Sequence, residues 1–184
     1  MPRRAERLLP AAYALLGLLA AGPAHGYDLH RHFAPGGPLA EVCRLQINQL
    51  YALLKKLADL GYLAQTSAEP SGAAPPRRAF ELTLAGHEAL TSWLDEPVRH
   101  TRDVRLEFLL KLYFARRRAP EQATALLEAQ AAVTSSLVRR LERELALLPD
   151  TPDADFGRLV LDIRLRQNRA VLGWLEDTLG GAAA

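Results

Sequence analysis

The segment LQINQLYALLKKLADLGYL, residues 45–63, decides how this 184-residue chain is interpreted. Its apolar residues recur at the i, i+3, i+4, i+7 spacing of a helix with one buried face. The face predicted to anchor the helix in a core consists of Ile47, Leu50, Tyr51, Leu54, Leu57 and Ala58. The other face starts with amides and ends with amines, at Gln46, Asn48, Gln49, Lys55 and Lys56. The chemistry of that second face indicates what the helix contacts.

Two further helices are expected before this one. The first is predicted at about 8–21, where a Gly-Pro pair breaks it, and the second at about 25–33. The helix that carries the opening segment is expected over about 42–60 and ends at Gly61, a residue suited to a left-handed cap. In the second helix the side chains expected to point inward are Tyr27, Phe33 and either Leu29 or His30.

A hairpin and a fourth helix follow. Strands are predicted at 62–66 and 78–83, and residues 67–76 between them are rich in Pro, Gly, Ala and Ser, as expected of a hairpin tip. A helix at about 85–94 completes the unit. Three helices followed by a two-stranded wing predict a winged helix-turn-helix, and the chain as a whole is predicted to be mainly α.

The remaining residues predict three more helices, at about 103–117, 120–147 and 154–179, with Asp153 as a cap for the last. The long helix carries an apolar stripe at Leu126, Gln130, Val133, Leu137, Leu141, Leu145 and Leu148. The last helix carries another at Phe156, Leu159, Ile163, Ala170, Val171, Trp174 and Thr178. Two antiparallel helices could bury these stripes against each other or against a second chain.

Charge is distributed unevenly along the chain. Residues 1–80 hold nine Lys and Arg against five Asp and Glu, a net charge of +4, whereas residues 81–184 hold fourteen and sixteen, a net charge of −2. The basic excess lies in the part that contains the opening segment, as expected if that part approaches an anion. The single Cys43 excludes an internal disulfide.

The N-terminus has a second interpretation. Arginines, an apolar run at 8–21 and then small residues outline a secretory signal peptide. The run is shorter than the roughly 20 apolar residues that span a bilayer. The competing interpretation is an amphipathic core helix, whose inward residues would be Leu8, Ala12, Leu15, Leu16 and Leu19.

The amide-then-lysine face has a direct explanation as a DNA-recognition surface. Asn and Gln can pair with base edges, as in their bidentate pairing with adenine, and Lys suits phosphate. A helix-turn-helix places the N-terminal part of its recognition helix deepest in the major groove. Arg77 and Arg78, where the wing returns, would add a second basic contact. The alternatives are a solvated helix face and a winged-helix module that binds a protein partner.

Four segments resemble the PadR family of bacterial transcriptional regulators: LLGLLAAGPAHGYDL, LYALLKKLADLGYL, RRAFELTLAGHEALTSWLDEP and LEFLLKLYFA. The resemblance covers residues from about 12 to 115, and the helical remainder is similar to that family's C-terminal dimerisation region. It implies that 8–21 is a helix of the DNA-binding domain rather than a signal peptide. It also implies two domains, a winged helix-turn-helix DNA-binding domain at 1–97 and a helical dimerisation domain at 98–184.

The resemblance implies roles for single residues. Tyr51 matches the tyrosine of the family's recognition helix that commonly lies near the DNA backbone. Two positions depart from the family pattern: Asn48-Gln49 replaces a pair of small residues, and Phe80 replaces a tyrosine. The DNA-binding residues expected are therefore Gln46, Asn48, Gln49, Tyr51, Lys55, Lys56, Arg77 and Arg78. The family includes sensors of aromatic molecules, so a candidate effector pocket is assigned to Trp93, Phe108, Tyr113, Phe114 and Trp174, with ordinary core packing as the alternative.

Other constellations point to no chemistry. The spacing of His25, His30, His32 and Cys43 fits no structural zinc pattern, so no metal and no cofactor are expected. A thiol beside Arg44 could have a lowered pKa and sense oxidants. No catalytic pattern is present, and the three arginines at 116–118 fit a surface helix end. We expect a cytoplasmic, homodimeric repressor of a palindromic operator, not an enzyme and not a membrane protein, that a small molecule or stress signal releases.

Overall fold

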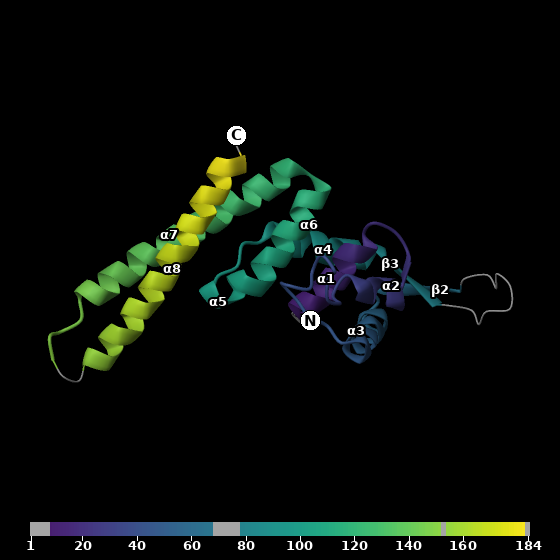
Figure 1. The fold of residues 1–184 in the computed structure, drawn as a ribbon, viewed down its shortest axis with the longest axis horizontal. Coiled ribbons are helices and arrows are strands. Elements are labelled where there is room, and N and C mark those ends of the chain that lie inside the picture. Colours follow the sequence, from purple (N-terminus) through teal and green to yellow (C-terminus); the bar gives the residue numbers. More distant parts are fainter. Residues whose placement is uncertain (1–7, 68–77, 152–153, 183–184) are drawn as a thin grey trace, which may run out of the picture. The chain divides into compact units, whose positions relative to one another are not determined.

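The computed structural model describes residues 8–67, 78–151 and 154–182. The chain divides into two compact units, Met1–Asp95 and Glu96–Ala184. Each has its own core, and Figure 1 shows the elements of both.

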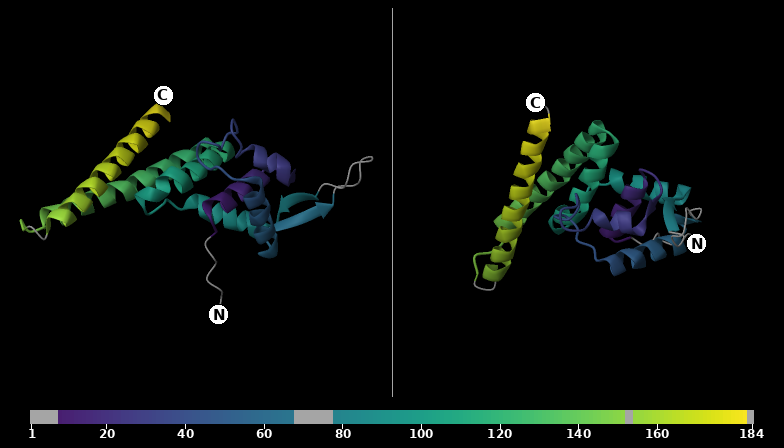
Figure 2. Two further views of the ribbon diagram at one scale, coloured as in Figure 1. Left: turned by 60° about the horizontal axis from the view of Figure 1, so that its bottom comes forward. Right: turned by 45° about the vertical axis from the view of Figure 1, so that its right-hand side comes forward.

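The N-terminal unit is a winged helix-turn-helix. Its helices are α1 (Pro10–Leu19), α2 (Gly26–Arg31), α3 (Ile47–Asp59) and α4 (Leu84–Asp95). Its strands form an antiparallel sheet in the order β1-β3-β2, made of β1 (Ala24–His25), β3 (Arg78–Leu82) and β2 (Leu63–Ser67). The wing, β2 and β3, projects beside α3, as Figure 2 shows. The two-residue β1 was not predicted, because a strand this short has no periodicity that sequence reasoning could detect.

Aliphatic side chains from three helices fill the core of this unit. The buried residues of α1 include Leu15 and Leu16, and those of α3 are Leu50, Leu54 and Leu57. The helix predicted at residues 8–21 is confirmed as α1, and its buried side chains belong to the core. Tyr13 of α1 stacks on Trp93 of α4 with ring centroids 4.6 Å apart.

Several predictions about residues 25–60 are wrong. Residues 42–46 are not helical, because Gln46 has the extended backbone of a cap (φ −72°, ψ 150°) and α3 begins only at Ile47. The preceding segment is a series of turns, with Gly36 at φ +82°. Tyr27, Ile47 and Tyr51 were expected in the core but are 66%, 40% and 48% exposed. Helical periodicity gives the direction of an apolar face, but Ile47 and Tyr51 lie at its edge, where the core ends.

The regular elements of the C-terminal unit within the described residues are all helices. They are α5 (Thr101–Asp103), the π-helix η1 (Val104–Phe108), α6 (Leu109–Arg118), α7 (Pro120–Ala146) and α8 (Asp155–Ala182). The helix predicted at 103–117 is therefore interrupted by a π turn. The long helices α7 and α8 lie side by side as a hairpin (Figure 1). None of the helices within the described ranges has the length and apolar character needed to cross a membrane.

The two apolar stripes of this unit have different fates. In α7, Leu126, Gln130 and Leu141 are buried as predicted. In α8 the residues that pack toward α7 include Leu165, Leu172 and Leu175. Most of the predicted α8 stripe is left on the surface instead, at Phe156, Leu159, Ile163 and Trp174. Val171 is the exception, because it packs against the buried cluster around Phe108. The cap predicted at Asp153 lies outside the described residues.

Candidate nucleic-acid interface

Helix α3 has one buried face and one face that is free to contact another molecule. Leu50, Leu54 and Leu57 are each 0% exposed, which fixes the rotation of the helix about its axis. The side chains of the predicted recognition surface on this helix are exposed: Gln46, Asn48, Gln49, Tyr51, Lys55 and Lys56. Lys55 and Lys56 follow Gln49 by six and seven residues, which places them about 9–10 Å further along the axis.

The amides at the start of α3 also cap the helix. The backbone N–H of Gln46 donates to Oε1 of Gln49 at 3.0 Å, and the backbone N–H of Gln49 donates to Oδ1 of Asn48 at 2.8 Å. These oxygens thus satisfy N–H groups that have no partner within the helix. Each of these oxygens keeps a second lone pair and each side chain keeps its NH2 donors, so both amides can cap the helix and still pair with a base edge.

A groove of about 840 Å³ lies beside α3. Its lining comes from α2, α3 and all three strands, and comprises His25, Gly26, Tyr27, Asp28, Tyr51, Lys55, Gln65 and Phe80. It combines aromatic rings, an imidazole, one Lys amine, an amide and the Asp28 carboxylate, so the Lys amine and the Tyr hydroxyls are its groups that could bind a DNA backbone. Sequence reasoning singled out Tyr51 and Lys55 but not His25, Tyr27 and Gln65, because strand pairing and the packing of α2 on α3 bring those three to the groove.

Gly26 shapes this groove. A Cβ at this position would lie 2.6 Å from Cε1 of Tyr51 and 2.9 Å from its hydroxyl oxygen. The tyrosine ring therefore packs directly on the first residue of α2. The absence of a side chain at Gly26 allows Tyr51 to lie against α2 while remaining 48% exposed.

The position of the wing relative to α3 is fixed by a short polar network. The Thr83 hydroxyl donates to the carbonyl of Gly61 at 2.7 Å and accepts from the N–H of Gly86 at 3.1 Å. Gly61 has φ +78°, the left-handed conformation that ends the helix where the sequence predicted. Arg78 begins β3, and Arg77 lies outside the described residues.

The five aromatic residues assigned to an effector pocket do not form one described cluster. Phe108 and Trp174 meet edge to face with centroids 6.3 Å apart, and Tyr113 and Phe114 do so at 5.0 Å. Trp93 belongs to the other unit, where it stacks on Tyr13. Phe108 and Phe114 are 0% and 4% exposed, so their visible role is core packing.

The redox and metal hypotheses find little support. Burial raises the pKa of the Cys43 thiol, so the lowered pKa expected from Arg44 is wrong. Among the residues that the structure describes, no group of three His, Cys, Asp or Glu side chains could hold a metal ion.

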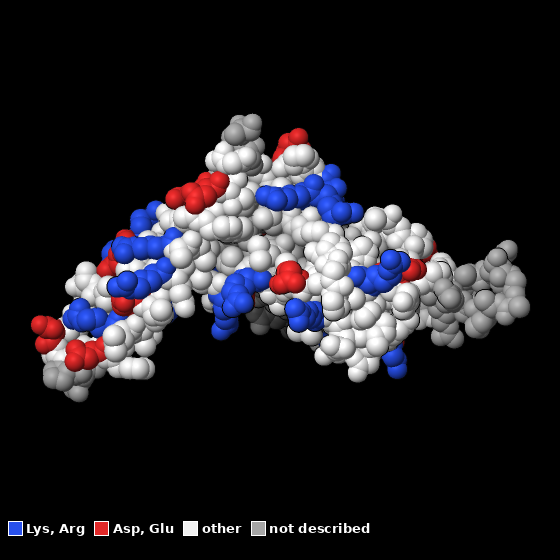
Figure 3. Space-filling model, in the orientation of Figure 1, with Lys and Arg blue, Asp and Glu red and all other residues white. Residues whose placement is uncertain are grey.

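The charges of α7 and α8 largely compensate one another. On the face visible in Figure 3, blue and red side chains are interspersed along this hairpin. Ion pairs join Arg140 to Glu144, Arg166 to Asp162 and Arg169 to Glu142. Arg117 at the end of α6 lies over the Tyr113 ring, 5.5 Å from its centroid. Mixed signs along α7 and α8 suit a polyanion less well than the outward face of α3, where amides and lysines are exposed.

A winged helix that displays amides and amines on its outward helix defines a DNA-binding transcriptional regulator. A profile described as "Transcriptional regulator PadR-like family" matches residues 15–92, and one described as "Virulence activator alpha C-term" matches residues 104–181. The negative transcriptional regulator PadR of Bacillus subtilis (strain 168) is 32% identical over 177 residues, which are 91% of this chain and 94% of the relative. The chain belongs to the PadR family of transcriptional regulators, and so it is not an enzyme.

Crystal structures of Bacillus subtilis PadR are also similar. The one in complex with operator DNA is 27% identical, covers 94% of this chain and 98% of that chain, and gives a TM-score of 0.46. The one in complex with p-coumaric acid is 26% identical, covers 96% and 100%, and gives a TM-score of 0.44. The family assignment rests on the sequence identity along nearly the whole chain.

Proposed function

We propose that this protein represses transcription by binding a palindromic operator as a homodimer in the cytoplasm. The observation that carries the proposal is the outward face of α3, where exposed amides precede exposed lysines on a helix held by three fully buried leucines. The amides reach base edges, and Lys55, Lys56 and Tyr51 bind the backbone. Arg77 and Arg78 bind it from the wing. Repression is supported by the relative in Bacillus subtilis, which is a negative transcriptional regulator.

Gln49→Glu tests the base-reading role without removing the cap. A glutamate at this position can still accept the Gln46 N–H, and a carboxylate suits a helix N-terminus. The substitution replaces the outward NH2 donor by a negative charge facing DNA. We expect unchanged or higher thermal stability and a loss of operator affinity of about 1–3 kcal/mol or more.

The readout is a gel-shift titration on operator and on random DNA. Gln49→Ala serves as the neutral counterpart, because it removes the donor without adding charge. It should lose more affinity for operator than for random DNA. Equal losses on both DNAs would show that Gln49 does not read bases. Lys55→Ala should weaken binding to both DNAs alike. It should also reduce the slope of log affinity against log salt concentration by roughly one unit.

The surface stripe of α8 is the proposed dimer interface. Phe156, Leu159 and Ile163 are 75%, 67% and 51% exposed, and they recur at helical spacing along one face. Fully burying a large apolar side chain contributes about 1.5–3 kcal/mol. If two copies of the chain pack these stripes against each other, each copy buries its own stripe, and the summed burial favours the dimer. A twofold arrangement of this kind matches a palindromic operator.

Ile163→Glu tests the interface by sedimentation. A charge in the centre of the stripe should shift the protein to monomer and remove cooperative operator binding. Gly173→Glu is the matched control on the same helix, because a Cβ there meets no atom within 4 Å and the position lies off the stripe. A dimer that survives Ile163→Glu would exclude this face.

Release by a small molecule is the remaining part of the proposal. The aromatic residues Trp93, Phe108, Tyr113, Phe114 and Trp174 are its candidate contacts. Titration with p-coumaric acid, present in one structure of the Bacillus subtilis relative, should quench Trp fluorescence and release operator DNA. No change in either signal would exclude this acid as the effector.

The rival function is a winged helix that docks a protein partner. Salt separates the two, because phosphate binding weakens steeply between 50 and 200 mM salt whereas a mainly apolar protein contact does not.

A further inference from the structure

Three of the five buried polar side chains in the described residues bond to one short segment, and the other two bond to members of those three. The complete set is Glu107, Lys111, Gln130, Thr134 and Asn168, each at most 6% exposed. All five belong to the C-terminal unit. They hold residues 96–101, which begin directly after α4 and end at the first residue of α5. We call residues 96–101 the connector.

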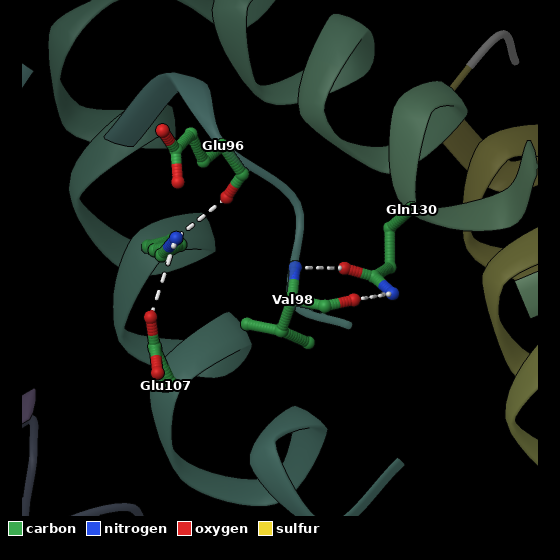
Figure 4. Close-up of polar contacts among 5 residues, drawn as sticks. Glu96, Val98, Glu107 and Gln130 are labelled. Carbon is green, nitrogen blue, oxygen red and sulfur yellow. Dashed lines mark hydrogen bonds and ion pairs between the residues drawn. The ribbon is translucent and has the colours of Figure 1, made fainter. Parts of the chain in front are cut away.

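Gln130 clamps the middle of the connector. Its Oε1 accepts the N–H of Val98 at 2.8 Å, and its Nε2 donates to the carbonyl of Val98 at 3.0 Å (Figure 4). A side chain thus makes the pair of hydrogen bonds that a neighbouring β-strand would make. Thr134 accepts a longer bond of 3.4 Å from the same Nε2, and its own hydroxyl donates to the Gln130 carbonyl. The Val98 side chain is 2% exposed, so the clamp acts inside the core.

Both ends of the connector are held as well. Nζ of Lys111 donates to the carbonyl of Glu96 at 2.5 Å and pairs with Oε1 of Glu107 at 3.4 Å. Figure 4 labels both of these glutamates. The hydroxyl of Thr101 donates to Oδ1 of Asn168 at 2.6 Å. Pro97 fixes its own φ and restricts Glu96 to extended conformations. The first residue after α4 is therefore already held by the C-terminal unit.

Stability of the helical unit alone does not account for this arrangement. Apolar residues of similar size would fill the same positions with less desolvation, and replacement of buried ion pairs by apolar side chains is often neutral or stabilising. Buried polar groups with every bond made instead select one conformation, because any other leaves donors or acceptors unpaired. The conformation selected here is that of the connector.

We infer that Lys111, Gln130 and Asn168 are positioning residues for DNA recognition: by holding the connector in one conformation they restrict a homodimer to one spacing between operator half-sites. The inference rests on the proposed function, since it needs a dimer that reads two half-sites. It adds that the spacing is determined by side chains that do not belong to the DNA-binding unit.

Operators with altered spacing test this inference. A preferred operator is first selected with the wild-type protein from random DNA, and one or two base pairs are then inserted or deleted between its half-sites. Each base pair displaces a half-site by about 3.4 Å along the duplex and rotates it by roughly 34°. Wild-type protein should lose affinity about tenfold or more for one inserted pair, the scale of one lost base contact.

Gln130→Leu removes the clamp and keeps an apolar side chain of similar size. It should bind the preferred operator more weakly than the wild-type protein does. One inserted base pair should lower its affinity by no more than about threefold, so that the spacing profile, the plot of affinity against half-site spacing, flattens. Thr101→Val is a milder variant that removes only the bond to Asn168 and should flatten the profile partially. Gln122→Leu, an exposed position on the same helix, is the control and should keep the wild-type profile. Circular dichroism and sedimentation establish which variants are folded dimers.

A purely structural role for Gln130 would lower stability and leave the shape of the spacing profile unchanged. Wild-type profiles in folded, dimeric Gln130→Leu and Thr101→Val would overturn the inference and leave the proposed function intact. Failure of the wild-type protein to select any DNA would overturn the proposed function and this inference with it.

Discussion

Gly26→Ala is a substitution that should impair DNA binding without unfolding the protein. The new Cβ would lie 2.6–2.9 Å from three atoms of the Tyr51 side chain, Cε1, Cζ and the hydroxyl oxygen. Such contacts are far shorter than the 3.5–4.0 Å optimum between carbon atoms. The ring is the flexible and exposed end of its side chain, so it yields rather than the backbone. Tyr51 should therefore leave the groove beside α3.

The expected magnitudes follow from this geometry. Gly26 does not have positive φ, so its backbone accepts alanine. Alanine is a better helix residue than glycine by roughly 1 kcal/mol, which offsets part of the lost ring packing. The free energy of unfolding should therefore change by less than about 1 kcal/mol. Loss of one phosphate contact by the Tyr51 hydroxyl should weaken DNA binding by about 0.5–1.5 kcal/mol, or roughly two- to tenfold.

A double-mutant cycle with Tyr51→Ala is the assay. Fluorescence anisotropy of labelled operator DNA gives the four affinities, and urea unfolding gives the four stabilities. If alanine at Gly26 acts only by displacing the ring, it should have little further effect once Tyr51 has been truncated. Equal losses of affinity from Gly26→Ala in both backgrounds would refute the reasoning, and so would wild-type affinity of the single variant.

Four further outcomes are expected. Leu54→Ala, at a 0% exposed position of α3, should lower the free energy of unfolding by about 2–5 kcal/mol; a smaller loss in urea titration would mean that α3 is not anchored as described. Because burial raises its pKa, Cys43 should react with iodoacetamide more slowly at pH 8 in the native protein than in urea, and equal rates would contradict its burial. The contribution of the neutral Cys43 thiol to the free energy of unfolding is fully present below the ordinary thiol pKa and is lost as the pH rises through the raised value. This fall in stability at high pH should be absent in Cys43→Ala. Lys56→Ala should reduce the salt slope of DNA binding by about one unit and leave sequence preference unchanged, a combination that competition with random DNA measures directly.

The helices and the wing of the N-terminal unit could be predicted because each has a local cause. Leu50, Leu54 and Leu57 follow helical periodicity, and Gly61 marks the end of α3 by its left-handed backbone. The exposed amides at the start of α3 were found for the same reason, since the face opposite the leucines has to be the outer one.

The parts that sequence reasoning missed depend on contacts between distant residues. The ring of Tyr51 packs on Gly26, which lies on another helix, and periodicity within α3 could not predict that contact. The clamp of Val98 joins residues 32 positions apart. From the sequence alone, Gln130 could be interpreted only as a polar residue within the apolar stripe of a helix. In α8 the residues that pack on α7 include Leu165, Leu172 and Leu175, whereas most of the predicted stripe is exposed, because periodicity alone does not tell which of two apolar faces a neighbouring helix covers.

The two units distribute polar and apolar side chains in opposite ways. In the described residues of the N-terminal unit every buried side chain of the core is hydrophobic, and α3 presents amides and amines outward. In the C-terminal unit the buried polar residues lie inside, and α8 presents Phe156, Leu159 and Ile163 outward. A polar outer face with amines suits a polyanion such as DNA, and this kind of binding weakens as salt concentration rises. An apolar outer face suits another protein surface, and that kind of binding does not weaken with salt. One chain thus carries two recognition chemistries that respond to different conditions. If the apolar face of α8 holds the proposed dimer, that dimer should persist at salt concentrations that release DNA.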